Sequence, residues 1–327
     1  MQKLVTIFGG SGFVGRYIAR RLAKQGWRVR VAVRRPNEAH FVRMYGAVGQ
    51  VVPVFANIRD DASVAAALSG ADAVVNCVGI LSESGKNGFD AVQAEGATRI
   101  ARLAAAEGID RMVHVSAIGA DAGSDSDYAR SKAKGESGVT QHMPDAVILR
   151  PSLIFGPEDN FFNRFAGMAR LAPILPVVGP NTKFQPVFVD DVAAAAALAV
   201  DGKAQAGVYE LGGPDVDTFR ELMQTMLHVI RRRALLLTVP FFVARIMAWV
   251  LDMGQAITGG LLHNGTLTRD QVRNLANDNI VTGEYPGFDA LGIAPTSMEA
   301  ILPGYLWRFR PSGQYSDIKD SARNMKT

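Results

Sequence analysis

Three glycines that follow the first apolar run carry the clearest chemical signal in the sequence. Gly9, Gly12 and Gly15 come directly after Leu4-Val5-Thr6-Ile7-Phe8 and open a stretch of helical composition. In such a strand, turn and helix, the first glycine permits the tight turn, the second lets backbone approach a pyrophosphate, and the third lets helix and strand pack closely. The positive end of the helix would then hold the phosphates. The pattern predicts a dinucleotide site; the alternative is that the glycines only shape a turn.

Two arginines stand where an acidic residue would select NAD. About twenty residues after the glycines, at the end of the second apolar run, the sequence has Arg34 and Arg35 and no carboxylate. A guanidinium offers a fixed fork of donors to a 2′-phosphate, whereas a carboxylate would repel it. We therefore expect NADP(H), with Arg34 in contact because it comes first after the strand and Arg35 facing solvent. The alternative is a solvated basic strand end.

Short apolar runs alternate with helical patterns through the first two-thirds of the chain, as in a parallel sheet covered on both faces. The sequence thus predicts an α/β fold with a doubly wound parallel sheet of Rossmann type. The expected strands are Val5–Phe8, Arg28–Val33, Val51–Phe55, Ala73–Cys77, Met112–Ser116 and Ala146–Leu149, and the expected helices are Val14–Gln25, Val64–Leu68, Ala91–Glu107 and Ser131–Gln141.

Prolines interrupt the chain after Arg150, and we expect a smaller, interleaved C-terminal lobe to begin there. Residues 1–155 would form the dinucleotide-binding domain, to which 185–215 return. Residues 156–184 and 216–311 would form the smaller lobe, which docks on a partner or a membrane. Residues 312–327 are polar and are expected to be a flexible tail.

The composition excludes several classes of protein. A chain of 327 residues with 48% hydrophobic residues can bury a large core. Its one cysteine, Cys77, cannot form an internal disulfide, and its five histidines lack ligand spacing, so no metal site is expected. A net charge of +4 is too mild over this length to indicate nucleic acid. Glycines interrupt the first apolar run, Leu4–Phe8, too early for a signal peptide, so we expect a cytoplasmic chain.

The stretch Ala234–Leu251 is apolar and aromatic and follows Arg231, Arg232 and Arg233. Basic residues followed by aromatic and aliphatic ones are typical of an interfacial segment that meets anionic headgroups. The alternative is an ordinary core helix preceded by a solvated charge run. Pro240 and Arg245 argue against a membrane-spanning helix.

The glycine pattern, the run Asn76-Cys77-Val78-Gly79 and the spacing Tyr128-x-x-x-Lys132 together resemble the extended short-chain dehydrogenase/reductase superfamily over residues 1 to about 215. In that superfamily the tyrosine moves a proton at the substrate oxygen, and the lysine holds the nicotinamide ribose. Ala117 stands where a working hydroxyl is expected, beside Ser116. We therefore expect no catalytic residues; in an active enzyme they would be Tyr128, Lys132 and Ser116.

A closer resemblance lies in three further stretches, the runs 149–163 and 184–192 and Thr268-Arg269-Asp270-Gln271-Val272. They resemble the alpha-subcomplex subunit nine family of respiratory complex I. The resemblance implies a tightly bound NADPH without established turnover, and a place on the peripheral arm beside the quinone-site subunits and the membrane. Because no mitochondrial presequence is recognisable, we expect a bacterial protein at the cytoplasmic face of the inner membrane.

The leading hypothesis is thus a non-catalytic, NADPH-binding accessory subunit of complex I that touches other peripheral-arm subunits and an anionic lipid surface. The alternatives are an NADP(H)-dependent reductase or epimerase acting on a nucleotide-sugar or similar hydroxyl substrate, and a nucleotide-sensing regulator. The residues expected to bind the cofactor are Gly9, Ser11, Gly12, Phe13, Val14, Gly15, Arg34, Arg35, Asn57, Ile58, Cys77, Val78, Gly79, Ser116, Tyr128, Lys132, Pro151 and Ile154.

Overall fold

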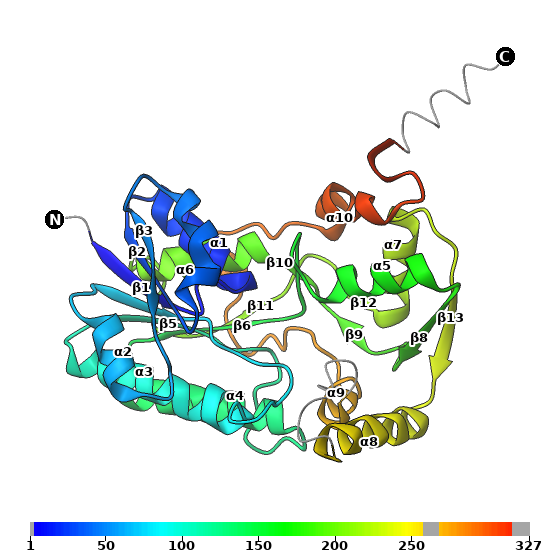
Figure 1. Cartoon of the computed structure of the whole chain (residues 1–327), viewed down its shortest axis with the longest axis horizontal. Coiled ribbons are helices and arrows are strands. Elements are labelled where there is room, and N and C mark those ends of the chain that lie inside the picture. Colours follow the sequence, from blue (N-terminus) through cyan, green and yellow to red (C-terminus); the bar gives the residue numbers. More distant parts are fainter. Residues whose placement is uncertain (1–2, 258–267, 316–327) are drawn as a thin grey trace.

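A seven-stranded parallel sheet organises the N-terminal part of the chain (Figure 1). The structure is a computed structural model that describes residues 3–257 and 268–315. The strand order is β11-β6-β5-β4-β1-β2-β3, and every neighbouring pair is parallel. The strands are β1 (Leu4–Phe8), β2 (Arg28–Val33), β3 (Val51–Phe55), β4 (Ala73–Asn76), β5 (Arg111–Val115), β6 (Val147–Pro151) and β11 (Gly207–Leu211).

Helices cover both faces of this sheet, because successive strand side chains point to opposite faces and both sets are apolar. On one face, α1 (Phe13–Lys24) and α6 (Val189–Val200) pack on a cluster that includes Val5, Ile7 and Val31. On the other, α2 (Asp61–Leu68), α3 (Glu95–Ala106) and α4 (Asp127–His142) pack on a cluster that includes Phe8 and Val74. The predicted doubly wound α/β fold is confirmed.

The first strands and helices lie within a few residues of their predicted bounds, and two of the helices differ from the prediction in an informative way. The helix expected at Ser131–Gln141 begins at Asp127, one turn earlier. The helix expected at Ala91–Glu107 consists of a π-helical turn, η2 (Asp90–Ala94), followed by α3.

Most of the remaining elements surround a third hydrophobic cluster that includes Phe155, Phe162, Leu175, Met226 and Leu302, and two of the helices pack on a smaller fourth cluster that includes Ala244, Ala248 and Val272. These elements are β7 (Ile154–Phe155), α5 (Phe161–Leu171), β8 (Ile174–Val178), β9 (Lys183–Phe184), β10 (Val187–Phe188), β12 (Asp217–Thr218), α7 (Phe219–Val229), β13 (Leu235–Val239), α8 (Phe241–Ile257), α9 (Arg269–Asn274) and α10 (Met298–Leu306). Short 3-10 helices are η1 (Pro36–Tyr45), η3 (Phe288–Leu291), η4 (Trp307–Phe309) and η5 (Gly313–Tyr315). Of the expected tail, residues 316–327 lie outside the described part of the chain.

The apolar stretch 234–251 is divided at Pro240 into β13 and α8, and it is not an ordinary core helix. Helix α8 buries its small residues Ala244 and Ala248 completely, whereas Phe242 is 66% exposed and Trp249 is 47% exposed. Within residues 3–257 and 268–315, no helix combines the length and the apolar character needed to cross a bilayer.

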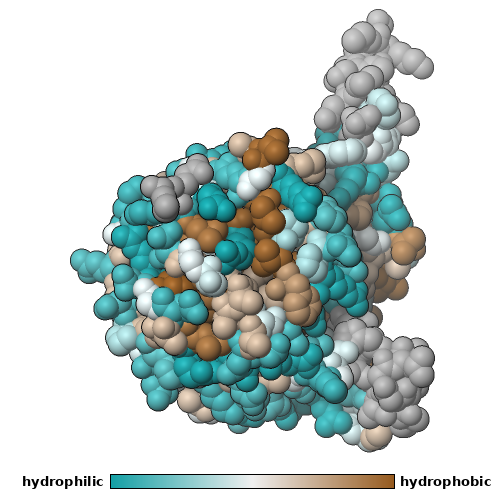
Figure 2. All heavy atoms as spheres, turned by 60° about the vertical axis from the view of Figure 1, so that its left-hand side comes forward, coloured by the Kyte–Doolittle hydropathy of each residue, from teal (hydrophilic) through white to brown (hydrophobic). Residues whose placement is uncertain are grey.

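Neither edge strand of the large sheet offers an uninterrupted row of backbone groups. At one edge, the outward N–H of Glu210 in β11 donates to the Pro286 carbonyl at 3.0 Å. At the other edge, Gln50 and Ala56, which flank β3, form backbone hydrogen bonds to β2. Because the backbone groups of successive strand residues point alternately to the two sides, those of Pro53 point away from β2. Proline has no N–H to donate. Figure 2 shows that hydrophilic residues cover most of one side of the molecule and that apolar residues gather in one area of it.

Candidate functional site

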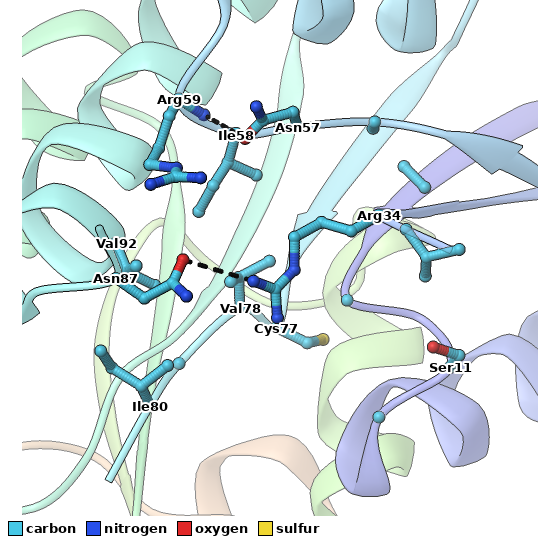
Figure 3. Close-up of a pocket in the computed structure, with 16 residues that line it drawn as sticks. Ser11, Arg34, Asn57, Ile58, Arg59, Cys77, Val78, Ile80, Asn87 and Val92 are labelled. Atoms are coloured by element: carbon cyan, nitrogen blue, oxygen red, sulfur yellow. Dashed lines mark hydrogen bonds between the residues drawn. The ribbon is translucent and has the colours of Figure 1, made fainter. Parts of the chain in front are cut away.

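A pocket of about 270 Å³ lies at the carboxyl ends of β1, β2, β3 and β4 (Figure 3). Parallel α/β sheets bind ligands at this end of their strands. Half of the residues that the sequence predicted to bind a cofactor line it: Gly9, Ser11, Gly12, Arg34, Asn57, Ile58, Cys77, Val78 and Gly79. The remaining lining residues are Ala32, Val33, Ala56, Arg59, Ile80, Asn87 and Val92.

The glycine loop has the geometry that the sequence predicted. Gly9 has a φ of +74°, and a Cβ on Gly15 would lie 2.4 Å from the Gly9 carbonyl oxygen, so a larger residue cannot replace Gly15 without moving the loop. Gly12 is the N-cap of α1 and provides no side-chain acceptor, and the first turn contains no acidic residue. The N–H groups of this turn are therefore available to an anion.

Arg16 closes the loop from the helix side, a role that the sequence did not reveal. Its Nε donates to the Gly12 carbonyl at 3.2 Å, and its Nη2 donates to the Ser11 carbonyl at 3.0 Å. The guanidinium also lies 3.6 Å from a carboxylate oxygen of Glu158. Arg16 thus ties the glycine loop to the first turn of α1.

The two arginines after β2 lie in different surroundings. Arg34 lines the pocket, and its Nη1 donates to Asn87 Oδ1 at 3.3 Å (Figure 3). Arg35 is not among the lining residues, and its exposed side chain pairs with Glu38 at 3.1 Å. Arg34 is therefore the residue placed to meet a ligand phosphate.

A second guanidinium in the pocket, that of Arg59, was not predicted. Its Nη1 donates to the Lys86 carbonyl at 2.7 Å, and its backbone N–H donates to Asn57 Oδ1 at 3.2 Å. Among the contacts described, Arg34 and Arg59 both meet neutral oxygens and no carboxylate. Two guanidiniums without a carboxylate partner suit an anion.

The Cys77 side chain lines the same pocket. Burial raises the pKa of its thiol to about 12, so the group is protonated at neutral pH. A thiol in that state is a weak nucleophile.

Lys132 lies next to the pocket. Its Nζ donates to the Val115 carbonyl at 3.2 Å and would lie 3.4 Å from a Cβ on Gly79. Burial lowers the pKa of Lys132 to about 8. The ammonium is 5.9 Å from the centre of the Tyr128 ring. Lys132 and Tyr128 thus share one face of α4, as their spacing of four predicts.

The electrostatics of Tyr128 favour the protonated phenol. Burial, and then the negative charge of Asp270, raise its pKa to about 12. The buried hydroxyl of Ser116, at the end of β5, has no hydrogen-bond partner among the residues described. An unpartnered buried hydroxyl is suited to a ligand polar group.

The other predicted residues lie outside the pocket lining. Phe13, Val14 and Gly15 form the first turn of α1, where Val14 packs against the core. Pro151 ends β6, and Ile154 in β7 packs against the same core cluster as Val14. The neighbouring region contains Ser116, directly after β5, and Tyr128 and Lys132, in the first two turns of α4.

These residues fit a nicotinamide dinucleotide. The loop provides backbone donors for a pyrophosphate, Arg34 provides a cation at the β2 end, and Ser116, directly after β5, provides an unsatisfied hydroxyl. The described residues include no group of three or more His, Cys, Asp or Glu side chains that could hold a metal ion.

Comparison with known proteins agrees with the fold. The model of the NAD dependent epimerase/dehydratase family matches residues 5–212. By structure, the chain is similar to the NADPH-dependent quinone oxidoreductase QOR2 of Escherichia coli, complexed with NADPH. The TM-score is 0.70 at 18% identity, over 92% of this chain and 98% of that one.

Two relatives in sequence are informative. The mitochondrial NADH dehydrogenase (ubiquinone) 1 alpha subcomplex subunit 9 of Arabidopsis thaliana is 35% identical over 95% of this chain and 79% of its own length. A ceramide reductase of Caulobacter vibrioides is 33% identical over 72% of this chain and 74% of its own length. The chain belongs to the NAD dependent epimerase/dehydratase family and, within it, to the family of the complex I alpha subcomplex subunit 9.

Proposed function

We propose that this protein is an NADPH-binding accessory subunit of respiratory complex I in which the nucleotide has a structural role. The similarity to the Arabidopsis subunit over 95% of the chain carries this proposal. The nucleotide would stabilise the fold by binding to the native state alone. Arg34, which lines the pocket without a carboxylate nearby in the described contacts, supports NADPH over NADH.

The chemistry of the nicotinamide end supports a non-catalytic role. A general base needs a pKa near the working pH, and burial and Asp270 raise the pKa of Tyr128 to about 12, which disfavours oxidation of a hydroxyl substrate by this residue. Ala117 replaces the expected hydroxyl, and the Lys132 ammonium is bonded to a backbone carbonyl. Tyr128 and Lys132 would then act as a static pair that holds the nicotinamide ribose.

Helix α8 supports docking close to a membrane. Phe242, Ile246, Trp249 and Val250 are exposed on a helix that buries alanines, and Arg245 is exposed beside them. Exposed aromatic and aliphatic residues with nearby cations suit an interface or an anionic lipid surface. We place the protein on the peripheral arm near the quinone site, at the cytoplasmic face of a bacterial inner membrane.

Native gels of membranes solubilised in a mild detergent test this function. The chain should migrate in a large assembly with NADH dehydrogenase activity, and mass spectrometry of that band should identify complex I subunits. Deleting the protein should reduce the amount of this assembly. A chain found alone, with the assembly unchanged in its absence, contradicts the proposal.

A second candidate is an NADP(H)-dependent reductase. The ceramide reductase relative and the intact pair Tyr128 and Lys132 favour it, and its substrate would be a ketone on a lipid rather than a nucleotide-sugar. Tyr128 would donate a proton to the substrate oxygen, and Lys132 would hold the ribose. NADPH consumption by the purified chain with a long-chain keto lipid, abolished by Tyr128→Phe, would establish this activity.

A further inference from the structure

A carboxylate from late in the chain caps the helix that carries Tyr128 and Lys132. Asp270 in α9 accepts hydrogen bonds from the backbone N–H groups of Asp127 at 2.7 Å and of Tyr128 at 3.2 Å, across 143 and 142 positions of sequence. The first N–H groups of a helix have no partner within it. Asp270 supplies acceptors for two of them, and its charge is favourable at the positive end of α4.

Ser126 completes this cap. Its hydroxyl donates to Asp270 at 2.9 Å and accepts from the N–H of Ala129 at 3.2 Å. The first three N–H groups of α4 therefore all have acceptors. This arrangement fixes the turn of α4 from which the Tyr128 side chain projects.

Helix α9 is held firmly enough to act as a support. Thr268 and Gln271 form a reciprocal capping box at its start. Arg273 donates to the Asp125 carbonyl at 3.3 Å and lies 3.9 Å from Asp127, which offsets the repulsion between Asp127 and Asp270. Gln271 also donates to the Leu81 carbonyl at 3.3 Å, next to Ile80 in the pocket wall.

We propose that Asp270 is a positioning residue of the nucleotide site, which fixes the first turn of α4 so that Tyr128 and Lys132 meet the nicotinamide half of the nucleotide. This inference rests on the proposed NADPH binding. Asp270 acts through α4 and not on the adenosine half, because the Arg34 and Arg59 guanidiniums come from the loops after β2 and β3.

The opposite side of α9 packs on α8. Val272 is buried in one cluster with Ala244 and Ala248, and Arg269 lies 3.7 Å from Asp252 of α8. The contacts of α9 thus connect the proposed docking helix with the helix that holds the nicotinamide end. We therefore expect α9 to transmit part of the effect of nucleotide binding to α8.

Two ligands separate this role from a general loss of stability. NADPH spans the whole site, whereas 2′,5′-ADP has only the adenosine half. Asp270→Ala should weaken NADPH binding on the order of tenfold, or about 1.4 kcal/mol, and leave the affinity for 2′,5′-ADP within about twofold. Calorimetric titration of the purified full chain measures both affinities.

A matched control lies in the same segment. The Asp278 carboxylate accepts from the Lys183 N–H at 2.9 Å and holds β9. Asp278→Ala should leave the affinities for both ligands unchanged. If Asp270→Ala does not fold, Asp270→Asn retains one carbonyl acceptor without the charge and should give a smaller loss confined to NADPH.

Hydrogen exchange gives an independent measurement. The amides of residues 127–129 should exchange faster in Asp270→Asn than in wild type, and NADPH should protect α8 amides less. Equal weakening of both ligands by Asp270→Asn, or no change in either, overturns this inference while the proposed function stands. A wild-type chain that binds neither ligand overturns both.

Discussion

The ammonium of Lys132 donates to the Val115 carbonyl at 3.2 Å, and both groups are buried. Burial lowers the pKa of this lysine from its usual 10.5 to about 8. An ammonium held at such a site destabilises the empty protein and is useful when a ligand adds acceptors. The buried ammonium thus lowers the stability of the nucleotide-free protein and is available to strengthen the binding of a ligand.

Lys132→Met should therefore stabilise the nucleotide-free protein at pH 7, by roughly 3 kcal/mol, because the buried charge is removed. Between pH 8 and 9 the unfolded wild-type chain binds more protons at Lys132 than the folded chain, so the free energy of unfolding rises with pH. Above pH 9 the raised pKa values of Cys77 and Tyr128 oppose this rise. Urea denaturation between pH 8 and 9 should show that the free energy of unfolding rises in wild type and does not rise in Lys132→Met. The exposed Lys134→Met serves as control and should keep it.

Arg34→Leu should lower the affinity for NADPH by about 10- to 100-fold, because a charge-assisted contact with the 2′-phosphate is lost. The affinity for NADH should change little. Arg35→Leu is the matched control, since Arg35 pairs with Glu38 outside the pocket lining. Fluorescence titration with NADPH and with NADH gives the ratio of the two affinities for each variant. Equal losses of NADPH affinity in the two variants would contradict the assignment of Arg34.

Tyr128→Phe should leave the NADH:quinone activity of the assembled complex within about twofold of wild type, because a static binding pair performs no proton transfer. The variant keeps the ring that packs edge-on against Phe89 at 5.9 Å, so its fold should be unchanged. Activity in membranes and NADPH content of the purified complex are the two measurements. Loss of an NADPH-oxidising activity would instead favour the reductase.

Replacing Phe242 and Trp249 together by serine should release the chain from membranes or from the assembly. Both residues are exposed, so the variant should fold normally. Met44→Ser is the matched control, because Met44 is 80% exposed on η1, away from α8. Sedimentation of membranes, followed by immunodetection, gives the bound fraction. Undiminished binding of the double variant would remove α8 from the interface.

Sequence reasoning succeeded where structure is determined by neighbouring residues. The glycine loop and Arg34 follow a strand directly, and both line the pocket. Arg59 and Asn87 come from later loops that meet only because the carboxyl ends of parallel strands converge. A search for cations after each predicted strand would have found Arg59.

The start of α4 is a second feature that the local sequence pattern did not predict correctly. The residues before Ser131 are polar and contain little apolar periodicity, so the helix was predicted to begin one turn late. Ser126 is a capping signal that could have corrected this boundary. The contribution of Asp270 could not be foreseen, because it depends on a tertiary contact between residues 143 positions apart in the sequence.

Pro53 on β3 has a consequence for how the molecule joins others. A strand from another chain that aligned with this edge would meet a position without a donor, and at the opposite edge it would find Glu210 already bonded to Pro286. Growth of the sheet from one molecule into the next is disfavoured at both ends. A partner that met the large sheet at either edge would therefore have to bind through side chains and not by adding a strand.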